Sequence, residues 1–220
     1  MRTLIKVILG IVISWFGAIC AITALHEAAY LPRGALSLVF LVFFIVGLLL
    51  FRKWRLVFAY VFGHEMTHYF TAKLFLKKTG KIKLHKTYGS VEVVDSNIWI
   101  VLSPYIVPFY AFLTVLIYGI VSIFYRTPWL DYSFAAIAAL GYAYHVILTF
   151  HALKLQQTDL DVYGPFLSGA IIFAGNTFQI LVAVLVFSRT WKNALLYSQE
   201  LILTQVDLFQ SALKLISGRQ

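Results

Sequence analysis

Long apolar segments separated by short polar breaks dominate the pattern of this chain. A helix that crosses a bilayer needs about 20 mostly apolar residues. Turn signals at Pro32-Arg33-Gly34 and Arg126-Thr127-Pro128 each end one such segment and begin another. The pattern predicts about six transmembrane helices, at residues 4–25, 34–51, 56–76, 98–125, 132–155 and 165–187.

Two further segments have a different character. Residues 80–97 are polar and rich in lysine, and the stretch 88–94 has the composition of a strand, which predicts a short β-hairpin. Residues 191–216 repeat apolar side chains among polar ones, which predicts a C-terminal amphipathic helix that lies on the membrane or packs on other helices. The expected organisation is therefore two N-terminal spans (1–55), a core of four helices with the hairpin (56–187), and an amphipathic tail (188–220).

The composition supports a membrane protein and excludes most other classes. Hydrophobic residues make up 61% of the chain and charged residues 12%, whereas a soluble domain is nearer half and a quarter. We therefore expect an all-α, multi-pass integral membrane protein in contact with the lipid bilayer, with the cell membrane as its location. The net charge of +9 comes from basic residues at the ends of apolar segments, where they anchor to headgroups. No nucleic-acid-binding motif accompanies them, so no nucleic acid partner is expected.

The densest set of polar residues lies in the middle of the third predicted span. It reads His64-Glu65-Met66-Thr67-His68, and residues four apart share one face of a helix, so both histidines can bind one ion. Glu65 is then close enough to act as the general base toward a water on that metal. Ionisable side chains in a span are costly unless they are sheltered. We predict one zinc ion per chain; the alternative is a buried polar network between helices.

A catalytic zinc site usually has three protein ligands, and the third is expected to be a carboxylate. The other acidic residues fall in the hairpin, a turn or the tail, which leaves Asp159 and Asp161 at the end of the fifth span. Two crossings return that end to the side of the membrane where the third span ends. His145 and His151 on the fifth span are alternative ligands or supporting donors. Asn176 in the sixth span either orients substrate or the aspartate, or bonds between helices.

These residues resemble the site-2 protease family, the membrane-embedded zinc metalloproteases, over roughly residues 56–187. The likeness rests on the motif from His64 to His68, on a carboxylate that opens a later span, and on Ser103-Pro104-Tyr105 with Pro108. The resemblance implies zinc, a water nucleophile, and cleavage of a membrane-anchored protein within or near its transmembrane segment. It also implies that the hairpin holds the substrate as an added strand, here at Gly89, Ser90 and Val91.

The chain also departs from many members of that family. It lacks their Asn/Pro-rich Leu-Asp-Gly motif and any PDZ-like insert, and it is more similar to a compact subgroup. That likeness favours Asp159 over Asp161, and its residues are Gly141, His145, Thr149, Gln157-Thr158-Asp159, Gly164 and Asn176. Two other functions fit the sequence: a catalytically silent relative that binds membrane proteins as a scaffold, and a metal or ion transporter. The sequence does not specify an oligomeric state.

Overall fold

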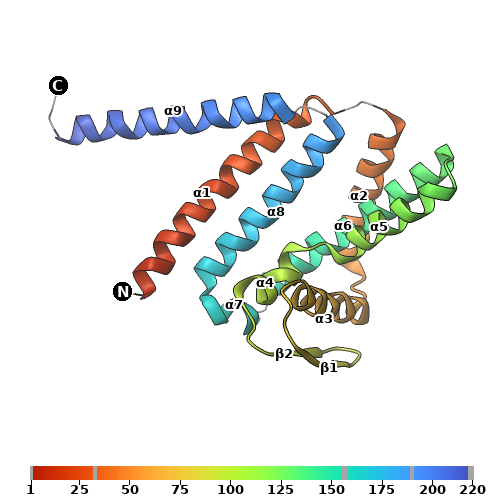
Figure 1. Ribbon diagram of the computed structural model, residues 1–220. Coiled ribbons are helices and arrows are strands. Elements are labelled where there is room, and N and C mark those ends of the chain that lie inside the picture. The colour runs from red at the N-terminus through yellow and green to blue at the C-terminus, as the bar shows by residue number, and fades with distance from the viewer. Residues whose placement is uncertain (1, 32–33, 155–157, 189–190, 218–220) are drawn as a thin grey trace. The chain divides into compact units, whose positions relative to one another are not determined.

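The computed structural model describes residues 2–31, 34–154, 158–188 and 191–217. These residues form helices and one small antiparallel sheet of two strands (Figure 1). The mostly helical class and the hairpin after the third helix are thus confirmed. The elements are α1 Arg2–Ala28, α2 Ala35–Lys53, α3 Val57–Leu74, β1 Thr79–Leu84, β2 Gly89–Val93, α4 Ile98–Ile106, α5 Phe109–Phe124, α6 Pro128–Lys154, α7 Thr158–Tyr163, α8 Pro165–Ser188 and α9 Trp191–Ser217.

The predicted number of membrane spans is not confirmed. Within the described residues, four helices are long and apolar enough to cross a membrane, namely α1, α2, α6 and α8. A fifth is possible if α4 and α5 together form one bent span. Helix α3 is not among them, since its 18 residues include His64, Glu65 and His68 in their middle. The chain is a multi-pass membrane protein, with four to five candidate spans among the described residues.

The span predicted over residues 98–125 consists of two helices that meet at 79°. The bend falls at Pro108, which has no backbone N–H and caps α5. The preceding residue, Val107, has the extended backbone that a following proline favours, with φ −85° and ψ 114°. Pro108 therefore ends α4 early and frees α4 to pack separately from α5.

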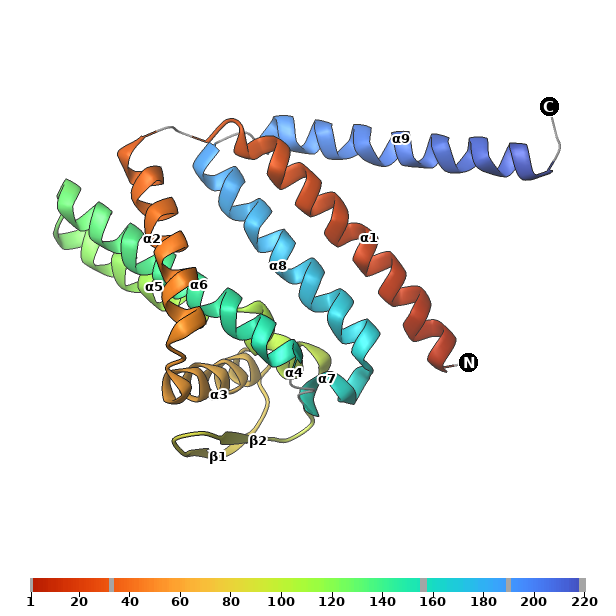
Figure 2. The ribbon, with the colours of Figure 1, turned by 180° about the vertical axis from the view of Figure 1, so that it is seen from behind.

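The chain forms two compact units. The first unit combines residues 1–32 with residues 169–220, and so contains α1, most of α8, and α9. Helices α1 and α8 lie side by side in this unit (Figure 2), with the rings of Phe16 and Phe178 6.3 Å apart. Helix α9 is tied to α1 by polar contacts, including Thr23 Oγ1 to Ser198 Oγ at 3.2 Å. The expected C-terminal helix is present and packs on α1.

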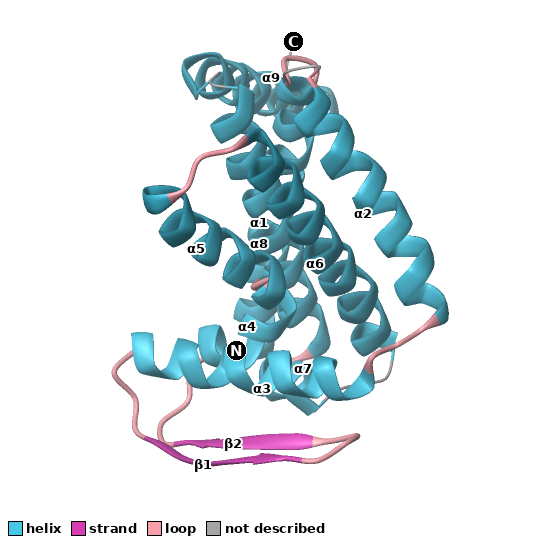
Figure 3. Cartoon of the chain, turned by 90° about the vertical axis from the view of Figure 1, so that its right-hand side faces the viewer, coloured by secondary structure: helices cyan, strands magenta, loops and turns pink. Residues whose placement is uncertain are grey.

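The second unit, residues 33–168, contains the hairpin and the helices from α2 to α7. Its most fully buried large side chains belong to α4, with Ile100, Leu102 and Tyr105 no more than 1% exposed. The hairpin runs alongside α3 (Figure 3), and its strands pair Ile82 with Val91. Helix α4 is therefore at the centre of this unit, with α3 packed against it.

A glycine turn sets the direction of the chain after the short helix α7. Gly164 has φ +95°, a left-handed conformation that costs a residue with a side chain about 1–2 kcal/mol. The turn leads into α8, where Ser168 donates its hydroxyl hydrogen to the Leu160 carbonyl at 2.9 Å. These contacts hold α7, which carries Asp159 and Asp161, in a defined place.

Replacing Gly164 by alanine is expected to lower the free energy of unfolding by about 1 kcal/mol, because an added Cβ disfavours this backbone conformation. Thermal unfolding of the purified protein in detergent measures the effect. Gly119→Ala is the matched control, since Gly119 lies inside α5 with open space around an added Cβ. That control should leave stability unchanged or raise it. Equal destabilisation by both substitutions would contradict the role of the turn.

Candidate metal centre

Helix α3 brings the two histidines of the sequence motif together on one face. His64 and His68 are four residues apart, and their Nε2 atoms lie 3.2 Å from each other. The two imidazole rings are nearly perpendicular, with centroids 4.8 Å apart. This geometry lets both Nε2 lone pairs point at one position beside the helix.

Asp159 completes the group from α7, far away in the sequence. Its Oδ2 atom lies 3.3 Å from His64 Nε2 and 3.5 Å from His68 Nε2. A tetrahedral ion with bonds of 2.0–2.1 Å separates its ligand atoms by about 3.3 Å. The three atoms are therefore spaced as metal ligands are, and the group His64, His68 and Asp159 could hold a metal ion.

The local electrostatics keep the Asp159 side chain in its ionised form. Burial by itself raises the pKa of this carboxyl, but hydrogen bonds to His64 and His68 outweigh burial and hold the pKa well below its usual range. A carboxylate binds a cation only when it is deprotonated. The aspartate is thus in the protonation state that a metal site requires.

Two hydrogen bonds orient the ligand side chains from outside the group. The Nδ1–H of His68 donates to the Ile100 carbonyl at 2.8 Å, which leaves Nε2 free to bind an ion. The Asn97 side chain caps this end of α4 by accepting from Ile100 N at 3.0 Å. Tyr105, also on α4, donates its hydroxyl hydrogen to Asp159 Oδ2 at 3.0 Å. Helix α4 therefore positions one histidine and the aspartate together.

Glu65 is on α3, on the side that packs against the hairpin, and is only 7% exposed. The backbone N–H of Val91 on β2 donates to its carboxylate. Gly89 packs so closely that an added Cβ would stand 2.6 Å from Glu65 Cγ, so only glycine fits there without displacement. Strand β2 is consequently in direct contact with the residue expected to be the general base.

The other predicted site residues are not members of the metal group. Asp161 is exposed and is not part of the group, although it is only two residues from Asp159. His145 is 8% exposed on α6 and lines a pocket beside His64 rather than joining the ligands.

His151 and Asn176 have other partners. The Nε2 atom of His151 accepts a hydrogen bond from Arg55 Nη1 at 3.2 Å. Asn176 belongs to the first unit, where its Nδ2 donates to the Ile172 carbonyl at 2.8 Å.

The other residues expected at the site lie on β2, on α6 or outside the described residues. Ser90 is exposed on β2, beside Gly89 and Val91. Thr149 lines the same pocket as His145, and Gly141 does so one turn before His145. Gln157 lies outside the described residues.

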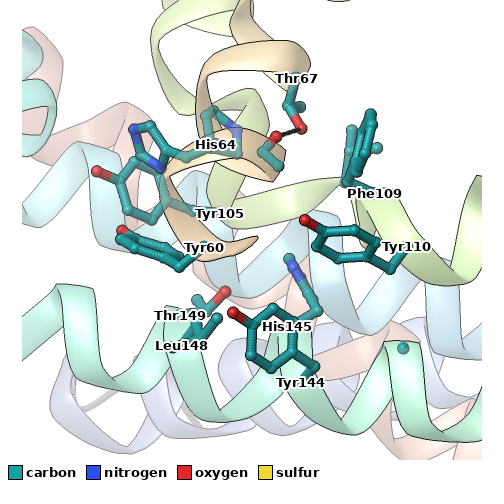
Figure 4. Close-up of a pocket in the computed structure, with 14 residues that line it drawn as sticks. Tyr60, His64, Thr67, Tyr105, Phe109, Tyr110, Tyr144, His145, Leu148 and Thr149 are labelled. Atoms are coloured by element: carbon teal, nitrogen blue, oxygen red, sulfur yellow. Dashed lines mark hydrogen bonds between the residues drawn. The ribbon is translucent and has the colours of Figure 1, made fainter. Parts of the chain in front are cut away.

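The sequence interpretation missed two tyrosines at this site. Tyr105 appeared only as part of a helix-start motif, whereas its hydroxyl bonds the proposed ligand Asp159. Tyr60 lies one helical turn before His64 and lines the pocket next to it (Figure 4). Its spacing of four residues from His64 is the one sequence signal that would have drawn attention to it.

Comparisons with known proteins do not identify a family for this chain. No family model matches the chain, and neither the curated proteins nor the solved structures give a match. The fold and site define a multi-pass membrane protein with a partly buried group of two histidines and one aspartate that could hold a metal ion.

Alanine at Asp159 is expected to weaken zinc binding by more than about a hundredfold, because it removes one of three ligand atoms. Asp161→Ala is the matched control and should keep near-wild-type affinity, since this side chain is exposed and outside the group. Titration with a competing chromophoric chelator measures both affinities. Equal losses in the two variants would show that the assignment of Asp159 is wrong.

Removal of the Tyr105 hydroxyl by a Tyr105→Phe substitution is expected to weaken zinc binding about tenfold, because contacts that orient a ligand contribute 10–100-fold. Tyr118→Phe removes a similar bond, from a tyrosine to Asp131 at 2.7 Å, away from the group. The same chelator titration should show unchanged affinity for that control. An unchanged affinity in Tyr105→Phe would mean that this hydrogen bond does not support the site.

Proposed function

We propose that this protein is a zinc-dependent endopeptidase that cleaves membrane-anchored proteins within or near their transmembrane segments. The observation that carries the proposal is the group of His64, His68 and Asp159 with Glu65 beside it, in a chain of apolar helices. Regulated release of a membrane-tethered protein is the process that such an activity would serve.

The donor set of the site is suited to zinc. Two imidazole nitrogens and one carboxylate oxygen are common ligands of catalytic zinc sites, which keep a fourth position open. When bound there, zinc would polarise the scissile carbonyl and lower the pKa of a water molecule to about 7. The ligand residues bind and orient the ion, and the contacts from Ile100 and Tyr105 hold them in place.

Glu65 is the residue that moves protons in the proposed reaction. Its carboxylate accepts a proton from the attacking water as the new C–O bond forms at the scissile carbonyl carbon. It then gives that proton to the leaving amine nitrogen as the C–N bond breaks, so the net change is the addition of one water. Burial beside Val91 fixes the carboxylate in one orientation for both transfers.

Strand β2 is the proposed platform for the substrate. Its one partner in the described sheet is β1, and Gly89 at its start packs against Glu65. An extended segment added next to Gly89, Ser90 and Val91 would gain main-chain hydrogen bonds close to the general base. A transmembrane substrate must unwind to become extended, so glycine, proline or asparagine in its span favours cleavage.

Cleavage of a model single-span substrate by the purified protein in detergent tests this function. We expect wild-type protein to cleave, and Glu65→Gln protein and chelator-treated wild type to be at least about a hundredfold slower. Zinc analysis of the Glu65→Gln protein is the control, since this variant keeps all three ligands and should bind one equivalent.

Each other outcome points to one of the alternatives. Bound zinc without cleavage by wild type would contradict the protease and favour a silent binding scaffold. Uptake of zinc into vesicles that hold the protein, without cleavage, would favour a transporter. Full activity of the Glu65→Gln protein would show that Glu65 is not the general base.

A further inference from the structure

Four tyrosines line the pocket beside His64, and three of them use their hydroxyl groups within the protein. Tyr105 donates to Asp159, Tyr110 donates to the Ala59 carbonyl at 2.6 Å, and Tyr144 donates to the Leu56 carbonyl at 2.6 Å. Tyr60 is different: among the described residues its hydroxyl is buried and has no hydrogen-bond partner. A polar group that is buried without a hydrogen-bond partner destabilises the folded protein. A phenylalanine would fill the same space without that cost.

Tyr60 lies beside one of the proposed metal ligands. Tyr60 is on the same face of α3 as His64 and His68, and its ring centroid is 5.4 Å from that of His64. In Figure 4 its hydroxyl points to the same side as the His64 imidazole and the Tyr105 hydroxyl. Tyr60 and His64 also line the same pocket, so the unused donor lies beside a proposed metal ligand.

A neutral phenol is suited to one task at this position. The hydroxyl of tyrosine keeps its proton at neutral pH and so acts as a donor. During peptide hydrolysis the carbonyl oxygen gains negative charge as water adds to the carbon. A preorganised donor aimed at that oxygen stabilises the transition state more than the ground state.

We propose that Tyr60 is a catalytic residue whose hydroxyl donates a hydrogen bond to the scissile carbonyl oxygen as that oxygen becomes negatively charged. This inference rests on the proposed peptidase function. No proton is transferred from Tyr60: the proton of the attacking water passes to Glu65 and then to the leaving nitrogen. Tyr60 and Tyr105 thus have different roles, because Tyr105 positions Asp159 whereas Tyr60 contacts the substrate.

The Tyr60→Phe substitution tests the proposal, with Tyr125→Phe as the matched control. Tyr125 is 70% exposed at the end of α5 and lies outside the site. For Tyr60→Phe we expect kcat on the model single-span substrate to fall about a hundredfold with little change in KM, the loss typical of one oxyanion donor. Zinc content should stay at one equivalent, and the unfolding temperature should be equal or higher, because an unpaired hydroxyl has been removed.

A second measurement does not depend on turnover. Protein loaded with cobalt in place of zinc is titrated with phenylphosphonate, a small anion with oxygens placed like those of the transition state, and binding is followed by the visible absorption of the cobalt. The dissociation constant should rise about tenfold in Tyr60→Phe, which corresponds to about 1.4 kcal/mol. It should stay at the wild-type value in Tyr125→Phe.

The two measurements separate the possible failures. Wild-type kcat and wild-type phenylphosphonate affinity in Tyr60→Phe would overturn the role of Tyr60 while leaving the peptidase intact. A fall in unfolding temperature together with loss of zinc would also overturn it, because Tyr60 would then be a structural residue. If wild type does not cleave, the peptidase fails, and an unchanged phenylphosphonate affinity would overturn the donor role as well.

Discussion

The need to satisfy buried polar side chains within the protein organises the second unit. Apolar surroundings provide no water for an imidazole or a carboxylate, so each such group must find its partners in the chain. His68 does so by bonding the Ile100 carbonyl on one side of its ring and approaching Asp159 on the other. These contacts fix α3, α4 and α7 to one another. The placement of three helices thus follows from the requirements of a few side chains.

Much of the fold and the metal group could be predicted from the sequence, because the decisive signals are local. Histidines four residues apart share a helix face whatever the rest of the chain does, so His64 and His68 were identifiable from spacing alone. The strand composition of residues 88–94 similarly indicated the hairpin that contains Gly89 and Val91. Counting of the available carboxylates reduced the third ligand to Asp159 or Asp161. The two aspartates lie on one short helix, α7, and its orientation decides which of them meets the histidines.

Some features could not be predicted because they depend on contacts between residues far apart in the sequence. Others depend on one residue that interrupts an otherwise regular apolar segment. The apolar run over residues 98–125 suggested one span, but the backbone restriction at Pro108 divides it into two helices. Helix α3 was counted as a span from its length, although its buried polar side chains lower its hydropathy. Tyr105 and Asp159 are 54 residues apart in the chain, so no sequence pattern joined them. The lack of a hydrogen-bond partner for the Tyr60 hydroxyl among the described residues depends on the tertiary structure, which no sequence pattern indicates.

The discontinuous first unit has a consequence for the order in which this protein folds. Helix α1 is made before residues 33–168, yet its partners, most of α8 and all of α9, come from residues 169–220. During synthesis α1 therefore has no packing partners from its own unit until residues 33–168 have been made. The second unit has no such delay, since all the residues of the metal group precede residue 169. Because compact units tend to fold as they emerge from the ribosome, the site can assemble before the last two helices are translated.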